Sequence, residues 1–344
     1  MVPTSEIIDS SNLVFVHHSM SGIYRKGMPG KFYYVDKYGD RITNEKDLER
    51  IKKLVLPPAW KEVWISPKKN GYLQATGIDA AGRKQYRYHT DWTTRKSDHK
   101  YFRLLEFGKA LPMARRQIAK DLRRKNFDER KVLAICSEVM QKTLIRIGNK
   151  TYKKAYGSYG LSTLKDQHFK QNGVKATLSF VGKKGVKQEI ELNDKNLIKL
   201  VKQCKDIPGQ ELFQFYTNGK AHKAIDSGMV NNYIREITNC DFTAKDFRTW
   251  GGTLEALRQL ACFTDQYPEM SKKKIIVEVL DVVAAKLGNT RAVCKSSYVY
   301  PLLLETFEKE GLTKYLKKIN STTSQENDEK VLLQFLKETS KKSS

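Results

Sequence analysis

The chain has 344 residues, of which 40% are hydrophobic and 10% aromatic, so it can bury a core and is not a disordered basic tail. It carries 63 Lys and Arg against 38 Asp and Glu, a formal net charge of +25. Such a surplus favours a polyanionic partner, with nucleic acid first and an anionic membrane surface second. At roughly 100–200 residues per domain, the length favours two domains.

Several classes of protein are excluded early. No apolar run approaches the roughly 18 residues that indicate a transmembrane helix, and the N-terminus lacks the pattern of a secretory signal. The five cysteines are widely spaced and form no CxxC pair, which favours reduced thiols over a disulfide framework or a zinc site. The sequence therefore predicts an intracellular protein that has no membrane partner and no metal site.

The first 90 or so residues are typical of a β-rich domain. Residues 32–39 and 62–66 are rich in β-branched and aromatic side chains, and a helix is expected over 45–56. The segments YLQATGID and RKQYRYH flank a small turn and predict an antiparallel hairpin. In the second of these strands Tyr86 and Tyr88 share one face, while Gln85 lies on the other.

From about residue 91 the pattern becomes helical. Segment 95–131 holds 13 Lys and Arg against 5 Asp and Glu, and Pro112 is expected to interrupt it. The apolar period near 3.6 predicts a helix over 128–149 that ends at Gly148 and Asn149.

One hairpin breaks the helical part of the chain. Residues 176–192 alternate in period 2 on both sides of a lysine-bearing turn, Gly182–Gly185. Further helices are predicted around residues 196–207, 227–237, 248–262 and 272–288. The fold class is thus α+β, with a small β-rich domain (1–90), a larger and mainly helical domain (91–318), and a polar tail (319–344) around one short amphipathic stretch.

Four side chains are candidates for anion binding or catalysis on the sequence alone. Arg146 and Arg248 stand in apolar surroundings, and an arginine is costly to bury unless it meets an anion, a structural ion pair or a route to solvent. Lys183, at the hairpin tip, is by default a solvated lysine, although its flanking glycines indicate a close approach. Tyr298, after two serines, is either an exposed nucleophile or a packed aromatic.

Seven short blocks, taken together, resemble type IB DNA topoisomerases of the short viral and bacterial, poxvirus-like branch. The resemblance covers roughly residues 30–315 and excludes the first 25 residues and the tail. The blocks occur in this order: LPPAWKEVWISP (56–67), GRKQYRYH (82–89), LIRIGN (144–149), YGLSTLK (159–165), FVGKKG (180–185), KDFRTWGG (245–252) and LGNTRAVCKSSYVYP (287–301).

The resemblance implies a two-domain monomer that clamps duplex DNA, with its active site at Arg146, Lys183, Arg248, Asn289 and Tyr298. In this family the tyrosine forms a 3′-phosphotyrosyl bond, the lysine is the general acid, and supercoils relax without ATP, metal or any other cofactor. The poxvirus pattern has histidine where this chain has Asn289, and asparagine donates a hydrogen bond but cannot titrate.

The resemblance also implies DNA contacts outside the active site. Gln85 can read adenine in the major groove, and Tyr86 and Tyr88 offer hydroxyls and flat faces, unless the tyrosine face packs on the core. Lys165 and Tyr152 are further candidates for phosphate contacts.

Two alternative functions stay open at this point. A tyrosine recombinase or integrase shares the Arg/Lys/Arg/Tyr set, but it usually has a histidine where this chain has Lys245. An architectural DNA-binding protein would use the charge alone and would not need Tyr298. The expected location is the bacterial cytoplasm or nucleoid, or a virion or viral replication compartment.

Overall fold

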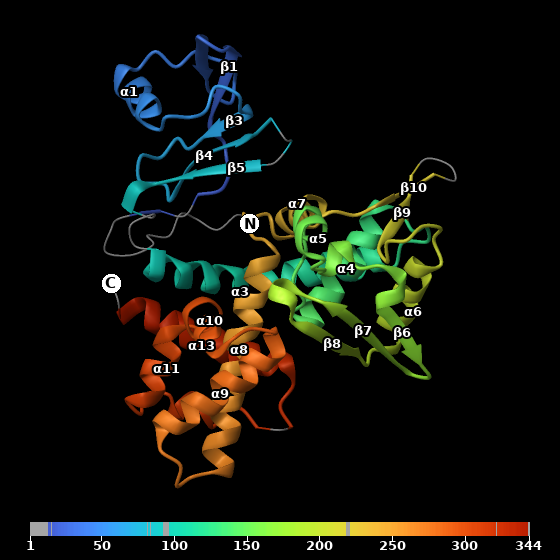
Figure 1. The fold of residues 1–344 in the computed structure, drawn as a ribbon. Coiled ribbons are helices and arrows are strands. Elements are labelled where there is room, and N and C mark those ends of the chain that lie inside the picture. Colours follow the sequence, from blue (N-terminus) through green and yellow to red (C-terminus); the bar gives the residue numbers. More distant parts are fainter. Residues whose placement is uncertain are drawn as a thin grey trace. The chain divides into compact units, whose positions relative to one another are not determined.

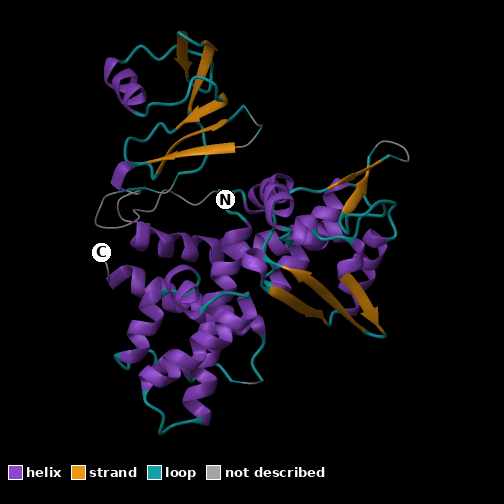
Figure 2. Cartoon of the chain, viewed as in Figure 1, coloured by secondary structure: helices purple, strands orange, loops and turns teal. Residues whose placement is uncertain are grey.

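The computed structural model describes residues 13–14, 16–80, 82, 84–91, 96–217, 221–320 and 322–342. The chain divides into two compact units. One unit comprises Met1–Arg103, Asn239–Asp241 and Lys337–Ser344, and the other comprises Leu104–Thr238 and Phe242–Leu336. A sheet dominates the first unit and helices dominate the second, so the predicted α+β class is confirmed (Figures 1 and 2).

The first unit contains a five-stranded antiparallel sheet with the order β2-β1-β3-β4-β5. Its strands are β1 (Ile23–Met28), β2 (Lys31–Val35), β3 (Lys61–Ile65), β4 (Leu73–Ile78) and β5 (Lys84–Tyr88). The strands predicted at 32–39 and 62–66 and the hairpin of β4 and β5 are confirmed. Strand β1 was missed, because IYRKGM shows no regular alternation of apolar and polar residues.

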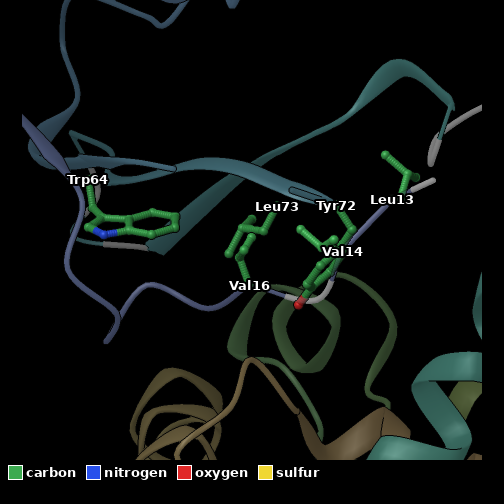
Figure 3. Packing of buried hydrophobic residues seen from close by; sticks show 6 residues of the cluster. All are labelled: Leu13, Val14, Val16, Trp64, Tyr72 and Leu73. Carbon is green, nitrogen blue, oxygen red and sulfur yellow. The ribbon is translucent and has the colours of Figure 1, made fainter. Parts of the chain in front are cut away.

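Two apolar clusters support this sheet. The first consists of Leu13, Val14, Val16, Trp64, Tyr72 and Leu73 (Figure 3). Helix α1 (Glu45–Lys53) confirms the predicted helix and places Ile51 in a second cluster with Ile65 and Ala75. Asn44 caps α1 by accepting a hydrogen bond from the Asp47 amide at 3.3 Å.

Helix α3 (Lys96–Leu122) runs through Pro112, so the predicted interruption is wrong. Proline removes one backbone hydrogen bond and strains the preceding turn, which costs about 3 kcal/mol in a helix interior. Burial of Phe107, Leu111 and Ile118 on this helix offsets that cost.

Helix α4 (Glu129–Thr143) ends six residues before the predicted end at Asn149. Leu144 takes the left-handed conformation with φ of 54°, and its amide donates to the Met140 carbonyl at 2.8 Å. This cap stops the helix, so Arg146 lies in a loop and not on a helix.

The predicted hairpin at 176–192 is confirmed as part of a three-stranded antiparallel sheet with the order β6-β7-β8. Its strands are β6 (Phe169–Asn172), β7 (Lys175–Val181) and β8 (Lys187–Leu192). A single 3-10 turn, Lys183–Gly185, joins β7 to β8 and carries the two tip lysines.

The four later predicted helices are confirmed as α6, α7, α8 and α9. The remaining elements of this unit are α5 (Lys150–Tyr156), α6 (Lys195–Lys205), β9 (Gln214–Tyr216), β10 (His222–Ala224), α7 (Ser227–Thr238), α8 (Ala244–Gln266), α9 (Lys272–Leu287), α10 (Arg291–Ser297), α11 (Pro301–Glu308) and α12 (Thr313–Leu316). The aromatic ring of Phe107 meets those of Phe242 and Phe247 edge to face at 5.2 and 4.9 Å.

Of the helices that the structure describes, none has the length and apolar character needed to cross a bilayer.

The segment predicted as a polar tail forms helix α13 (Gln325–Lys342), whose inner face is buried. Phe335 meets Tyr315 and Tyr300 edge to face, at 5.2 and 6.0 Å between ring centroids. Glu329 receives two hydrogen bonds from Arg115, at 2.6 and 2.8 Å. Burial opposes ionisation of Glu329, but Arg115 holds the pKa of this carboxyl below its ordinary value. The apolar side chains of the amphipathic stretch lie on the buried face, whereas the polar composition gave no sign of the ion pair between Arg115 and Glu329.

We expect Phe335→Ala to lower the free energy of unfolding by about 3–5 kcal/mol, because it removes a buried aromatic ring and leaves a cavity. Denaturant unfolding measures this loss. Lys330→Ala, on the exposed side of the same helix, is the matched control and should change stability by less than about 0.5 kcal/mol. Equal stability of the two variants would show that α13 is not packed against the helical unit.

Candidate active site

Arg248 lies in the first turns of α8 with only 4% of its surface exposed. Its Nη1 donates to the Leu144 carbonyl and its Nη2 to the Leu287 carbonyl, the second at 2.9 Å. Burial lowers the pKa of Arg248, and the charge of Arg146 adds to this, although Tyr298 acts against it. A guanidinium remains charged under such shifts. Its buried Nε has no hydrogen-bond partner in the described part of the chain.

The loop after α4 fixes the position of Arg146. The amides of Leu161 and Ser162 donate to the carbonyls of Arg146 and Ile147 at 2.8 and 2.7 Å. A Cβ on Gly160 would lie 2.6 Å from the Arg146 carbonyl oxygen, so only glycine permits this close approach. The segments LIRIGN and YGLSTLK therefore lie side by side and are joined by backbone hydrogen bonds.

Arg146 and Asn289 form a hydrogen-bonded pair. The Nη2 of Arg146 donates to the Gly288 carbonyl at 3.0 Å and to Oδ1 of Asn289. The asparagine amide is thereby oriented with its Nδ2 buried, and this nitrogen has no partner among the described residues. The pair thus presents unused N–H donors from both side chains, since Arg146 uses only one of its three nitrogens here.

Tyr298 directly follows α10 and lies against α8. Its amide donates to the Cys294 carbonyl at 3.0 Å, and its carbonyl accepts from Oγ1 of Thr253 at 3.1 Å. The centre of its ring lies 4.9 Å from Cζ of Arg248, within cation–π range. A Cβ on Gly252 would lie 3.0 Å from the Tyr298 carbonyl oxygen. The glycine in RTWGG therefore allows the tyrosine segment to approach the arginine helix.

Lys183 is the first residue of the 3-10 turn between β7 and β8, and its side chain is exposed. Lys184 and Gly185 close this turn with φ of 62° and 75°. The left-handed pair gives the tip a tight reversal, so Lys183 projects from the end of a hairpin and not from a long loop.

One cavity of about 930 Å³ brings most of the predicted set together. Arg146, Lys183, Arg248 and Tyr298 line it, and Asn289 is bonded to the first of them. Lys184 and Lys245 bring the number of lining cations to five, while no lining residue that the structure describes is acidic. Such a cavity favours a phosphate group, because several fixed positive charges act on it at once. Figure 1 shows α8, α9 and α10, which carry or flank three of these residues, packed together.

Of the two predicted phosphate contacts, Tyr152 and Lys165, only the first lies at the cavity. Tyr152, on α5, is 52% exposed and lines the cavity. Lys165 does not line it, and its Nζ donates to Oε1 of Gln210 at 3.2 Å.

The three candidates on β5 lie in the first unit. Tyr86 and Tyr88 are partly buried and pack against the first apolar cluster, and the rings of Tyr88 and Tyr72 stack at 6.0 Å. Gln85 donates to Asp79 at 2.8 Å. Core packing thus accounts for the tyrosines by itself, and their contact with DNA stays a prediction.

Sequence reasoning missed several residues that line the cavity. Tyr156 stands one turn beyond Tyr152 on α5, with ring centroids 5.9 Å apart, and is 71% exposed. The i, i+4 spacing of two tyrosines among lysines was the available signal. Lys245 occupies the position where recombinases have histidine, and its place one turn before Arg248 could have indicated a shared cavity.

Family models and relatives of known name match most of this chain. A family model described as "Eukaryotic DNA topoisomerase I, catalytic core" matches residues 89–331, and one described as "Bacterial DNA topoisomerase IB, N-terminal domain" matches residues 31–79. The DNA topoisomerase 1B of Acanthamoeba polyphaga mimivirus is 33% identical over 300 residues, which are 85% of this chain and 89% of the relative. The DNA topoisomerase 1B of vaccinia virus (strain Copenhagen) is 25% identical over 257 residues, 73% and 76% of the two chains.

The two family models together span both units, and the mimivirus relative covers most of the chain at substantial identity. The resemblance read from the seven sequence blocks is therefore confirmed. The chain belongs to the type IB DNA topoisomerase family.

Proposed function

We propose that this chain relaxes supercoiled duplex DNA by cutting and resealing one strand at a time, with Tyr298 as its nucleophile. The observation that carries the proposal is the cationic cavity in which Tyr298 meets Arg146, Lys183 and Arg248. The relatives are named DNA topoisomerases, which supports duplex DNA as the substrate.

The reaction exchanges one phosphodiester bond for another. The Tyr298 oxygen attacks a backbone phosphorus and its proton passes to water, because no described residue lining the cavity is a carboxylate or a histidine. The bond from phosphorus to the 5′ oxygen breaks, and that oxygen leaves with the electron pair and receives a proton. The product is a 3′-phosphotyrosyl bond and a 5′-hydroxyl. Attack by this hydroxyl reverses the step after the free end has rotated, so resealing requires no ATP.

Arg146, Arg248 and Asn289 would bind the nonbridging oxygens of that phosphate. Negative charge gathers on these oxygens in the transition state, and preorganised N–H donors stabilise it. The unpartnered Nε of Arg248 and Nδ2 of Asn289 support this role, because a buried donor without a partner is costly unless a ligand satisfies it. Two guanidiniums also supply positive charge at any working pH.

Lys183 would supply the proton to the leaving 5′ oxygen. An alkoxide is a poor leaving group, so a positioned acid accelerates bond cleavage by about 10²- to 10⁴-fold. The hairpin tip places this ammonium group on the wall of the same cavity as the nucleophile, which supports the assignment.

DNA beyond the reacting phosphate would contact both units. We assign Tyr152 and Lys165 to the backbone, and Gln85, Tyr86 and Tyr88 to the major groove or its edge. The enzyme would act as a monomer that clamps the duplex, in the cytoplasm or nucleoid of a bacterium or in a viral replication compartment or virion.

We expect the wild-type protein to relax a supercoiled plasmid in EDTA without ATP, and Tyr298→Phe to have no detectable activity, because the phenyl ring has no attacking oxygen. Gel electrophoresis of plasmid topoisomers measures this. Tyr300→Phe removes a hydroxyl two residues away and is the matched control, which should retain relaxation. Relaxation by Tyr298→Phe at the wild-type rate would refute the nucleophile assignment.

We expect Asn289→Ala to slow single-turnover cleavage on the order of ten- to a thousandfold, as for one lost oxyanion donor. Asn289→His should keep activity, because an imidazole N–H can replace the amide N–H. A cleavage rate for the alanine variant equal to wild type would show that Asn289 is not a transition-state donor.

We expect Lys183→Ala to slow cleavage by about 10²- to 10⁴-fold and to change DNA affinity little. Its loss should alter the slope of log affinity against log salt concentration by at most about one, since one phosphate contact is removed. Binding is measured in the Tyr298→Phe background, and Lys187→Ala on the same hairpin is the control for charge. Equal cleavage by the two lysine variants would remove Lys183 from the chemistry.

A further inference from the structure

Gln188 lies at the junction of the two halves of the site, although no part of the proposed reaction uses it. It is the second residue of β8, is partly buried, and pairs across the hairpin with Phe180. Its Nε2 donates to the Lys187 carbonyl at 3.2 Å, which orients the end of the side chain.

One side of the Gln188 side chain lies against the hairpin tip. A Cβ on Gly182 would lie 3.0 Å from Cγ of Gln188, so the glutamine stem packs on this backbone. Gly182 directly precedes Lys183, and its amide donates to the Val186 carbonyl at 2.8 Å to close the tip. Because Gly182 is bonded directly to Lys183, a shift of this glycine would also shift the backbone of Lys183.

The other side of Gln188 lies against the end of α9. A Cβ on Gly288 would lie 2.3 Å from Oε1 and 2.7 Å from Nε2 of Gln188, so the amide rests directly on this glycine. Gly288 caps α9 with φ of 58°, and its carbonyl accepts the hydrogen bond from Arg146. Asn289 is the next residue. Gln188 therefore contacts, through two glycines, the segments that carry the acid and the oxyanion donors.

We propose that Gln188 is a positioning residue that sets the distance between Lys183 and the Arg146–Asn289 pair. This inference rests on the proposed function. The contacts on both sides are van der Waals contacts, so the length and volume of the side chain fix the spacing. A shorter side chain leaves a gap, and the exposed hairpin tip with Lys183 can then move relative to the phosphate.

The step that suffers is protonation of the leaving group. Lys183 gives a proton from Nζ to the 5′ oxygen as the phosphorus–oxygen bond breaks and its electron pair moves to that oxygen. Misplacement by about 1 Å costs up to about a hundredfold in rate. A sulfur in place of the bridging 5′ oxygen leaves as a thiolate, which is a far weaker base and does not need the proton.

The test uses single-turnover cleavage of two duplexes that differ only in a bridging 5′ oxygen or 5′ sulfur at one mapped cleavage site. We expect Gln188→Ala to be about ten- to a hundredfold slower than wild type on the oxygen substrate and close to wild type on the sulfur substrate. Gln188→Met, which keeps the length of the side chain, should recover most of the lost rate. Glu189→Ala, at the next position and on the opposite face of β8, is the matched control.

Lys183→Ala and Asn289→Ala separate the possible outcomes. Rescue of Lys183→Ala and Gln188→Ala by sulfur, without rescue of Asn289→Ala, supports the proposal. Rescue of Lys183→Ala alone, or a wild-type rate for Gln188→Ala on oxygen, overturns the role of Gln188 and leaves the proposed function intact. Failure of sulfur to rescue Lys183→Ala overturns the general-acid role, and the role of Gln188 with it.

Discussion

The guanidinium of Arg248 joins the C-terminal ends of two helices that are far apart in the sequence. It donates to the carbonyl of Leu144, which caps α4, and to that of Leu287, the last residue of α9. Helix C-termini carry unsatisfied carbonyls and partial negative charge, so they offset part of the cost of burying this cation. The loops that leave these two ends carry Arg146 and Asn289, and their hydrogen bond closes the arrangement. One buried arginine therefore holds together the two loops that carry the donors we propose for the phosphate.

The pattern of apolar and polar residues in the sequence was sufficient to predict the hairpin of β7 and β8, whose turn is formed by neighbouring residues. The period-2 alternation and the flanking glycines predicted the hairpin that carries Lys183. Four of the five residues that the seven blocks assigned to the active site line one cavity. Pattern failed where tertiary contacts determine the outcome. Leu144 ends α4 early in a left-handed conformation while its carbonyl receives Arg248, and Pro112 stays inside α3 because its neighbours are buried. The amphipathic stretch in the last segment was visible in the sequence, but the full length of α13 was not, because its polar residues include Glu329, which a distant arginine neutralises.

The net charge of +25 divides into two groups with different tasks. Five cations line the cavity, and of these Arg146, Lys183 and Arg248 would act on one phosphate. Most of the others would meet the DNA backbone and release counterions, which gives affinity and a steep dependence on salt without chemistry. The same duplex would thus be bound by many weak contacts and cut by a few fixed ones. Gln188 carries no charge and belongs to neither group; the role we propose for it is to space Lys183 from the Arg146–Asn289 pair.

We infer that Tyr298 becomes covalently joined to the 3′ phosphate of a cut strand. The most direct test is to mix the protein with duplex DNA, stop the reaction with SDS, digest both components, and identify the modified peptide by mass spectrometry. We expect one modified peptide, which contains Tyr298 linked to a 3′-phosphorylated nucleotide, together with a free 5′-hydroxyl on the other fragment. Attachment to another residue, or to the 5′ end of the DNA, would contradict it.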